Sequence, residues 1–220
     1  MKTGTRALGI AESYSGTARV PTADHTDSGH SSAVSSPDSD ADTDATATPD
    51  GHTKSVLCGA VVRADRVVDG LAFETCTVGG DDATDAIASL YRSLGREDVR
   101  YVLVSGIAPA WFNLVDIGRL ASTLDRPVLS VSFEESEGLE PALSEHFAGD
   151  ALDHRLEIYR NAPPRRAVEV NAERVFVRAA GCDDDEAARV VRAFTPTGGR
   201  PEPLRVARMA ARAARQFVGN

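Results

Sequence analysis

The sequence is poor in lysine, in aromatic residues and in paired cysteines, and the cysteine pattern excludes two classes of protein. Lys2 and Lys54 are the only lysines, against 22 arginines, and aromatic residues make up 5% of the chain. Cys58, Cys76 and Cys182 lack the paired spacing of a zinc site or a disulfide scaffold. We therefore expect three reduced, mostly buried thiols.

Long hydrophobic runs are also missing. None is long enough to span a membrane, and the first residues lack a signal-peptide pattern. We expect a cytoplasmic protein without a membrane partner. The hydrophobic content of 42%, chiefly Val, Leu, Ile and Ala, is sufficient for a globular core.

Acidic residues give the chain a net charge of −9, but they are unevenly distributed. Residues 17–53 contain seven Asp and one Arg, which account for −6 of that total. The rest of the chain is nearly neutral, so the net charge does not exclude a nucleic-acid partner, whose phosphates respond to local arginine patches. Few lysines and many aspartates are typical of a salt-loving archaeon.

Residues 17–53 also contain hardly any large apolar side chains. A segment of Ser, Thr, Asp, Ala, Gly and Pro cannot bury enough surface to offset the entropy lost on ordering. We predict a single domain over residues 1–220, in which 17–53 form a low-complexity, acidic, disordered insertion.

One stretch organises the predicted fold. Residues 101–105 form a continuous apolar strand, which is typical of a parallel sheet covered on both faces. Gly106 ends it, and apolar residues then recur at helical spacing over about 112–124. Open α/β sheets bind ligands at the carboxyl ends of their strands, so Ser105 and Asn113 are expected near a site.

The other elements follow from the same periodicities. Strands are expected over residues 6–11, 55–63, 66–78, 127–133, 168–170 and 174–179. Helices are expected over residues 83–94, 139–147, 151–160, 183–194 and 202–217. The resulting order, β-β-β-α-β-α-β-α, predicts an α/β protein with a ribonuclease H-like mixed sheet and a C-terminal α+β extension. Flavodoxin-like and other mixed sheets fit the same order.

Several carboxylates lie where strands end or helices begin. Glu12 ends the first strand, Asp81 and Asp82 precede a helix, and Asp116 lies in the first turn of the next. If these points gather at one sheet edge, the carboxylates could hold Mg²⁺ or Mn²⁺ for phosphodiester hydrolysis. Aspartates at helix N-termini also serve as structural caps.

Ser105 is a candidate of another kind, a nucleophile at a strand end. No Gly-x-Ser-x-Gly elbow surrounds it, and no histidine is suggestively placed. The loop from Ser105 to Phe112, with Asn113 as a polar contact, could instead bind a small ligand or nucleotide, although the chain lacks a phosphate-binding Gly-x-x-x-x-Gly-Lys loop.

The most basic surface is expected near the C-terminus. Its arginines are Arg200, Arg205, Arg208, Arg212 and Arg215, and Arg165-Arg166 adds a smaller basic spot. Such a stripe is either a solvated helix face or a surface that contacts phosphates. Trp111-Phe112 is either a core anchor or a pair of rings on which a base stacks.

The most distinctive runs of the sequence are Arg6-Ala7-Leu8-Gly9-Ile10, Gly106-Ile107 followed by Phe112-Asn113-Leu114-Val115-Asp116-Ile117, and Pro201-Glu202-Pro203-Leu204-Arg205-Val206-Ala207. Together with Asp82-Ala83-Thr84, they resemble the archaeal endonuclease dU family, which is related to endonuclease V. The last run is the most specific of them. The resemblance implies a ribonuclease H-like fold and metal-assisted cleavage of DNA at or near deoxyuridine.

The resemblance also implies where metal-binding carboxylates would lie. The family pattern has aspartate at positions that in this chain are Ala11, Glu12, Gly79 and Ser105. One hypothesis is therefore an endonuclease dU-like nuclease with Mg²⁺ or Mn²⁺ at Glu12 and Asp82, catalytic candidates Glu12, Asp82, Asp116 and Ser105, and DNA phosphates on Arg200, Arg205, Arg208 and Arg212. The other is a family member that lost its metal site and binds nucleic acid or a protein without cleavage.

Overall fold

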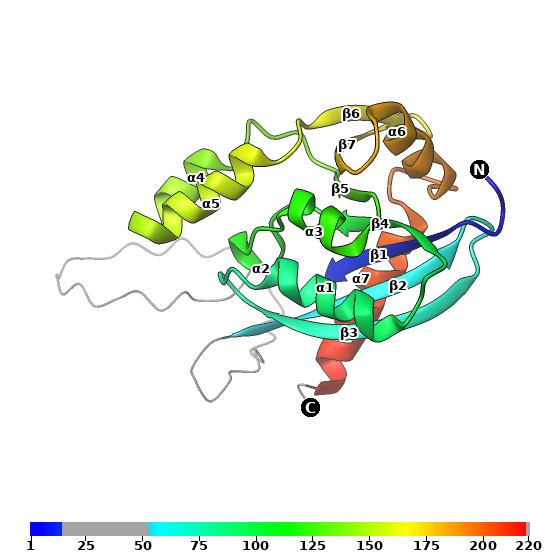
Figure 1. The fold of residues 1–220 in the computed structure, drawn as a ribbon, viewed down its shortest axis with the longest axis horizontal. Helices are drawn as coiled ribbons and strands as arrows, with labels where there is room; N and C mark the ends of the chain where they lie inside the picture. Colours follow the sequence, from blue (N-terminus) through cyan, green and yellow to red (C-terminus); the bar gives the residue numbers. More distant parts are fainter. Residues whose placement is uncertain (15–52, 219–220) are drawn as a thin grey trace, which may run out of the picture.

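The computed structural model describes residues 1–14 and 53–218, and seven strands within them form one mixed sheet (Figure 1). The strands are β1 (Arg6–Glu12), β2 (Lys54–Arg63), β3 (Val68–Thr77), β4 (Val99–Ser105), β5 (Val128–Ser132), β6 (Arg166–Val170) and β7 (Glu173–Ala180). The helices are α1 (Ala83–Leu94), α2 (Pro109–Phe112), α3 (Ile117–Leu124), α4 (Glu140–His146), α5 (Gly149–Asn161), α6 (Asp184–Ala193) and α7 (Glu202–Val218). The insertion predicted over 17–53 lies outside the described residues, apart from Thr53.

The sheet order is β3-β2-β1-β4-β5-β7-β6. β1, β4 and β5 are parallel to one another. β2 and β3 continue the sheet as an antiparallel hairpin beside β1, and β7 and β6 do so beside β5. The predicted C-terminal extension is therefore part of the same sheet. Because β1, β4 and β5 run in one direction, they end at one sheet edge, at Glu12, Ser105 and Ser132.

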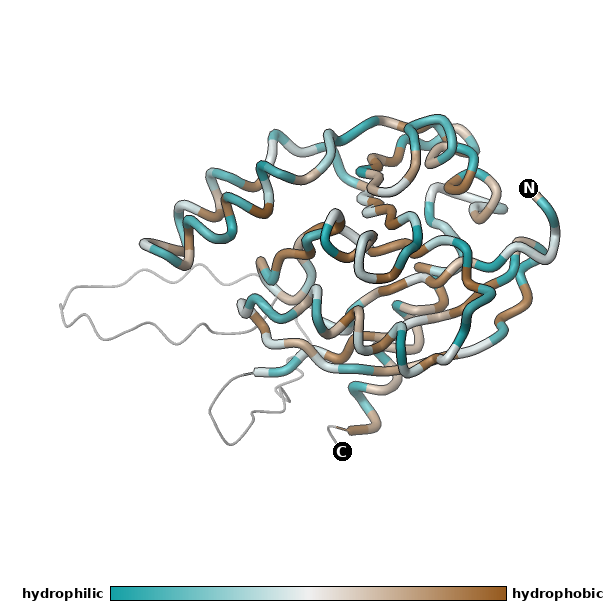
Figure 2. Tube along the Cα trace, viewed as in Figure 1, coloured by the Kyte–Doolittle hydropathy of each residue, from teal (hydrophilic) through white to brown (hydrophobic). Residues whose placement is uncertain are grey.

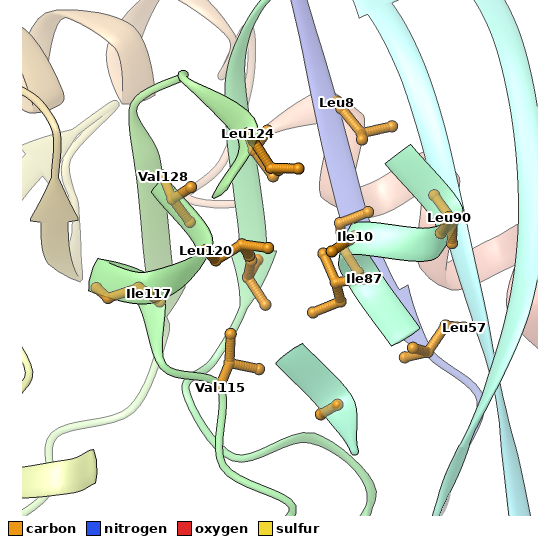
Figure 3. Close-up of a cluster of buried hydrophobic side chains, with 14 of the residues drawn as sticks. Leu8, Ile10, Leu57, Ile87, Leu90, Val115, Ile117, Leu120, Leu124 and Val128 are labelled. Carbon is orange, nitrogen blue, oxygen red and sulfur yellow. The ribbon is translucent and has the colours of Figure 1, made fainter. Parts of the chain in front are cut away.

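α1 and α3 cover one face of the sheet, where they bury the larger hydrophobic cluster (Figure 3). Leu8 and Ile10 are two positions apart on β1 and so point to this same face, and Ile87 and Leu90 lie one helical turn apart on α1. Each of these side chains is at most 1% exposed, and burial of each stabilises the fold by about 1.5–3 kcal/mol.

The opposite face is covered by α7, which crosses β1 and β2, and by α6, which packs on β6 and β7. Small side chains on both sides let α7 approach the sheet closely: Val206 and Ala207 pack on Ala11, Ala60 and Val62. The amphipathic pattern that predicted this helix is confirmed by these contacts.

Gly9, in the middle of β1, is where α7 comes closest to the sheet. A Cβ atom at this position would lie 2.2 Å from the carbonyl carbon of Pro203 and 2.6 Å from the backbone nitrogen of Leu204. Backbone atoms cannot swing away as a flexible side chain can, so only glycine fits beneath the first turn of α7.

The helix predicted over residues 112–124 is wrong at its start. Ala110, Trp111 and Phe112 have φ values of 46°, 54° and 58°, so α2 is a left-handed turn, and α3 begins only at Ile117. Asn113 is fully buried and bonds with Thr77 and with Ala83, the first residue of α1, which fixes the chain in an extended conformation here. Asp116 then caps α3.

α4 and α5 extend beyond the sheet as a helical hairpin (Figure 1). Brown and teal segments alternate along both helices in Figure 2, as expected for amphipathic helices that pack on each other. Leu143 and Arg155 are their buried residues. None of the helices in the described part of the chain has the length and apolar content that crossing a bilayer requires.

We predict that Gly9→Ala lowers the free energy of unfolding by about 3 kcal/mol or more, because the new methyl group overlaps the backbone of Pro203 and Leu204. Urea denaturation followed by circular dichroism measures the change. Gly4→Ala is the matched control, since a Cβ atom there meets nothing within 4 Å. Equal stability of the two variants would contradict the proposed close approach of α7.

Candidate functional site

A cavity of about 590 Å³ lies at the carboxyl ends of β4 and β5. Its walls carry the arginines Arg165, Arg178, Arg200 and Arg208, the serines Ser105, Ser130, Ser132 and Ser136, and the carboxylates Glu134 and Glu137. Guanidinium groups outnumber carboxylates on these walls, so the cavity favours an anion over a cation.

Arg200 lines this cavity and carries an unpaired donor. Its guanidinium lies 3.8 Å from the ring centroid of Phe133, a cation–π contact that fixes the side chain. Its Nη1 atom is buried and has no hydrogen-bond partner among the described residues. Burial lowers the pKa of Arg200, and the nearby charges of Arg208 and Arg212 lower it further. An anion bound in the cavity would offset the repulsion between these guanidinium groups.

The opposite wall holds its arginines rigidly. The Nε and Nη2 atoms of Arg165 donate to Ser132 Oγ at 3.2 and 3.0 Å, and its guanidinium lies 4.0 Å from the ring centroid of Phe176. Arg178 donates to the Pro163 carbonyl at 2.6 Å and to the Tyr159 hydroxyl at 3.2 Å. These contacts hold the positive charges of Arg165 and Arg178 at the cavity, and none of the acceptors in these bonds is a carboxylate.

Glu12 lies at the same sheet edge but outside the cavity lining. Burial raises its pKa, while the Tyr14 amide, Arg208, Ser55 and Arg212 lower it to a smaller extent. The Tyr14 amide and the Ser55 hydroxyl both donate to Glu12 Oε2, the latter at 3.4 Å. Arg208 therefore links Glu12 electrostatically to the cavity.

Asp82 is surrounded by hydrogen-bond donors. The Thr77 amide donates to both of its carboxylate oxygens, at 2.9 and 3.1 Å, and the Thr77 hydroxyl donates at 2.8 Å. Asn113 Nδ2 donates at 2.6 Å, and Lys54 Nζ lies 3.6 Å away. Burial raises the pKa of Asp82, but these bonds outweigh burial and bring the pKa below its ordinary value of 3.8.

Asn113 and Asp116 hold helix starts. Asn113 Oδ1 accepts from the Ala83 amide at 2.9 Å, and its Nδ2 donates to the Thr77 carbonyl at 2.8 Å. Asp116 Oδ1 accepts from the Arg119 amide at 2.8 Å and caps α3. Asp116 therefore has the structural capping role that aspartates at helix N-termini commonly serve.

The described residues hold no group of three His, Cys, Asp or Glu side chains that could bind a metal ion. Glu12 and Asp82 are both near Cys76, whose pKa is raised to about 12 by burial first and then by the two carboxylates. Their remaining contacts are to protein donors, which compete with a cation for the same oxygens. Metal binding at Glu12 and Asp82 therefore stays a prediction.

The positions where the family pattern has aspartate serve other purposes here. Ala11 is buried under α7, and Gly79 lies against Trp111, whose ring would be 2.8 Å from a Cβ atom at residue 79. Ser105 lines the cavity beside the arginines. Ala11, Gly79 and Ser105 are neutral, and the charged groups that line the cavity beside Ser105 are mostly arginines.

The four arginines proposed from the sequence for nucleic-acid binding do come together. Arg200, Arg205, Arg208 and Arg212 line a shallower hollow of about 370 Å³ on α7. Arg200 and Arg208 also face the larger cavity, whereas Arg205 is paired with Glu202 at 2.6 Å. The sequence did not indicate Arg178, because nothing local shows that its side of β7 faces this cavity.

We predict that Asp82→Asn lowers the free energy of unfolding by about 1 kcal/mol at neutral pH, because the new amide group places a donor where Thr77 and Asn113 already donate. The loss is modest because solvent partly screens this position. The lowered pKa of Asp82 stabilises the fold above pH 3.8, and that contribution is lost as the pH falls through the folded-state pKa. The deficit should therefore shrink in acid.

Urea denaturation between pH 3 and 7 with a chelator present tests this role. Asp81→Asn, at the exposed neighbouring position, is the control and should change stability little. A pH-independent deficit, or none, would contradict the anchoring role of Asp82.

Comparison with known proteins agrees with the fold and the motifs. The family model described as Endonuclease dU matches residues 41–215. A UPF0215 protein of Thermococcus kodakarensis is 37% identical over 164 residues, covering 74% of this chain and 82% of that protein.

Solved structures share the fold. A protein of unknown function from Archaeoglobus fulgidus superposes with a TM-score of 0.70 at 24% identity, covering 95% of this chain and 97% of that one. Endonuclease V of Ciona intestinalis, in complex with a 24mer DNA containing an inosine followed by a ribo-adenosine, has a TM-score of 0.57 at 12% identity, covering 97% and 87%. The predicted ribonuclease H-like fold is confirmed, and so is the resemblance read from the sequence: this chain belongs to the endonuclease dU family.

Proposed function

We propose that this protein binds the phosphate backbone of DNA, in the cytoplasm, at the arginine-lined cavity, without metal-dependent cleavage. The observation that supports this function best is the gathering of four arginines on the walls of one cavity, namely Arg165, Arg178, Arg200 and Arg208. A phosphate oxygen is a strong acceptor for guanidinium.

The arrangement of charges suits a phosphodiester. Arg200 and Arg208 reach the cavity from the α7 side, and Arg165 and Arg178 reach it from the β6–β7 side. Arg165 and Arg200 each stack on a phenylalanine ring, so little side-chain freedom is lost on binding. The volume of about 590 Å³ is that of an ordinary ligand pocket.

The comparisons support DNA as the partner only by analogy. The Ciona endonuclease V is described in complex with DNA, and its fold is similar to this one. The proposal therefore rests on the cavity itself, and fold likeness adds DNA as the first nucleic acid to test.

A second candidate function is hydrolysis of DNA at deoxyuridine with Mg²⁺ or Mn²⁺, which membership of the endonuclease dU family favours. It requires a cation at Glu12 and Asp82, whose oxygens already accept protein hydrogen bonds. The two candidates differ in whether bound DNA is cut.

We predict that Arg208→Gln weakens binding of a fluorescein-labelled single-stranded oligodeoxynucleotide about tenfold, because one charge-assisted contact to phosphate is lost. The slope of log affinity against log salt should fall by about 0.7 in magnitude. Fluorescence anisotropy over a KCl series measures both. Arg92→Gln, an exposed arginine in the last turn of α1, is the control and should change neither.

The same oligonucleotides, end-labelled and containing deoxyuridine or deoxyinosine, decide between the candidates. Incubated at high salt with Mg²⁺ or Mn²⁺, they should be bound and remain uncut. Metal-dependent nicking that disappears in Glu12→Ala or Asp82→Ala would replace the binding proposal with the hydrolytic one.

A further inference from the structure

Four aromatic rings gather near the cavity, outside the hydrophobic clusters that cover the two faces of the sheet. Trp111 lies 5.4 Å from Phe112, 5.3 Å from His146 and 5.4 Å from Phe147, measured between ring centroids. Phe112 lies 5.6 Å from His146 and 6.2 Å from Phe147. We call these four residues the aromatic platform.

The platform is accessible to solvent. His146 is exposed, and Trp111, Phe112 and Phe147 are half-buried. The chain has one tryptophan and seven phenylalanines, so this is a concentration of rings in a sequence that has few. Its members are absent from the buried hydrophobic clusters of the described residues. Core packing therefore does not account for the platform.

The backbone beneath the platform is strained and firmly held. Ala110, Trp111 and Phe112 are successive non-glycine residues with positive φ, a conformation that L-residues adopt only at a cost. The Gly79 amide donates to the Ala110 carbonyl at 2.8 Å. Arg155, 6% exposed, donates to the Phe112 carbonyl at 3.3 Å and lies 4.0 Å from the Phe147 ring. The fold thus maintains an unfavourable turn that presents two adjacent rings.

Both segments of the platform continue from residues that line the cavity. Ala108 lines the cavity three residues before Trp111. Leu139 also lines it and directly precedes α4, whose last residue is His146. At the rise of an α-helix, Leu139 and Phe147 are about 12 Å apart, a distance that a short stretch of nucleic-acid chain spans.

We infer that the aromatic platform stacks an unpaired base of a single-stranded nucleic acid whose phosphates occupy the arginine-lined cavity. This inference rests on the proposed function and adds the state of the ligand. Ring stacking accepts any base, since each has a π face, but a base inside a duplex is already stacked on its neighbours. The protein should therefore prefer single strands and show little sequence preference.

The single tryptophan gives a direct test, because intrinsic tryptophan fluorescence reports on Trp111 alone. The probes are a ten-nucleotide oligothymidylate and a ten-unit abasic oligomer with the same phosphates. We expect oligothymidylate to quench the fluorescence and to bind about fivefold or more tightly than the abasic oligomer. Binding of both with equal affinity and no quenching would overturn the inference and leave the phosphate proposal standing, whereas binding of neither would overturn the phosphate proposal.

His146→Ala provides the variant test, since removal of an exposed side chain at the end of α4 leaves the buried contacts of the helix intact. We expect its affinity for oligothymidylate to fall about fivefold, with unchanged affinity for the abasic oligomer and an unchanged salt slope. His154→Ala, at an exposed position on α5, is the matched control. An unchanged oligothymidylate affinity in His146→Ala, or equal losses for both oligomers, would contradict stacking on the platform.

Discussion

The close contact between β1 and α7 at Gly9 determines where the basic groups of this protein lie. Because residue 9 has no side chain, the backbone of Pro203 and Leu204 rests directly on the strand. The first turn of α7 is fixed there, and the helix then carries Arg208 to the carboxyl edge of the sheet. Arg200, just before the helix, is brought to the same edge. A looser contact at Gly9 would move both arginines away from the cavity together.

The residues of the sequence runs that identify the family make contacts that hold the fold together. Gly9 from the first run touches Pro203 from the last. Asn113 from the middle run bonds to Ala83 and Asp82, and the Asp116 amide bonds to the Thr84 hydroxyl at 3.0 Å. These pairs are distant in sequence and each depends on both partners. These contacts hold together segments that lie far apart in the chain.

The sheet edge beside Ser105 carries more guanidinium groups than carboxylates. Gly79 leaves room for the Trp111 ring, and Ser105 is a neutral wall of a cavity that arginines surround. The Asp82 carboxylate is satisfied by protein donors instead of standing free. In the function proposed above, this edge binds oxyanions through guanidinium groups, and the aromatic platform supplies a surface for bases.

Local patterns in the sequence were enough to predict the order of strands and helices, the hairpin beside β1, the family and the basic face of α7. These features depend on hydrophobic periodicity and on the spacing of motifs, which are properties of neighbouring residues. It failed at residues 112–116, whose extended path is fixed by hydrogen bonds from Asn113 to residues about thirty positions earlier. Only the tertiary structure decided that Asp82 bonds with Thr77 and Asn113 and that Asp116 caps α3. It also decided that Arg165 and Arg178 join Arg200 around one cavity. Those outcomes depend on which strand faces and loops the packed sheet brings together, and no local stretch of sequence contains that information.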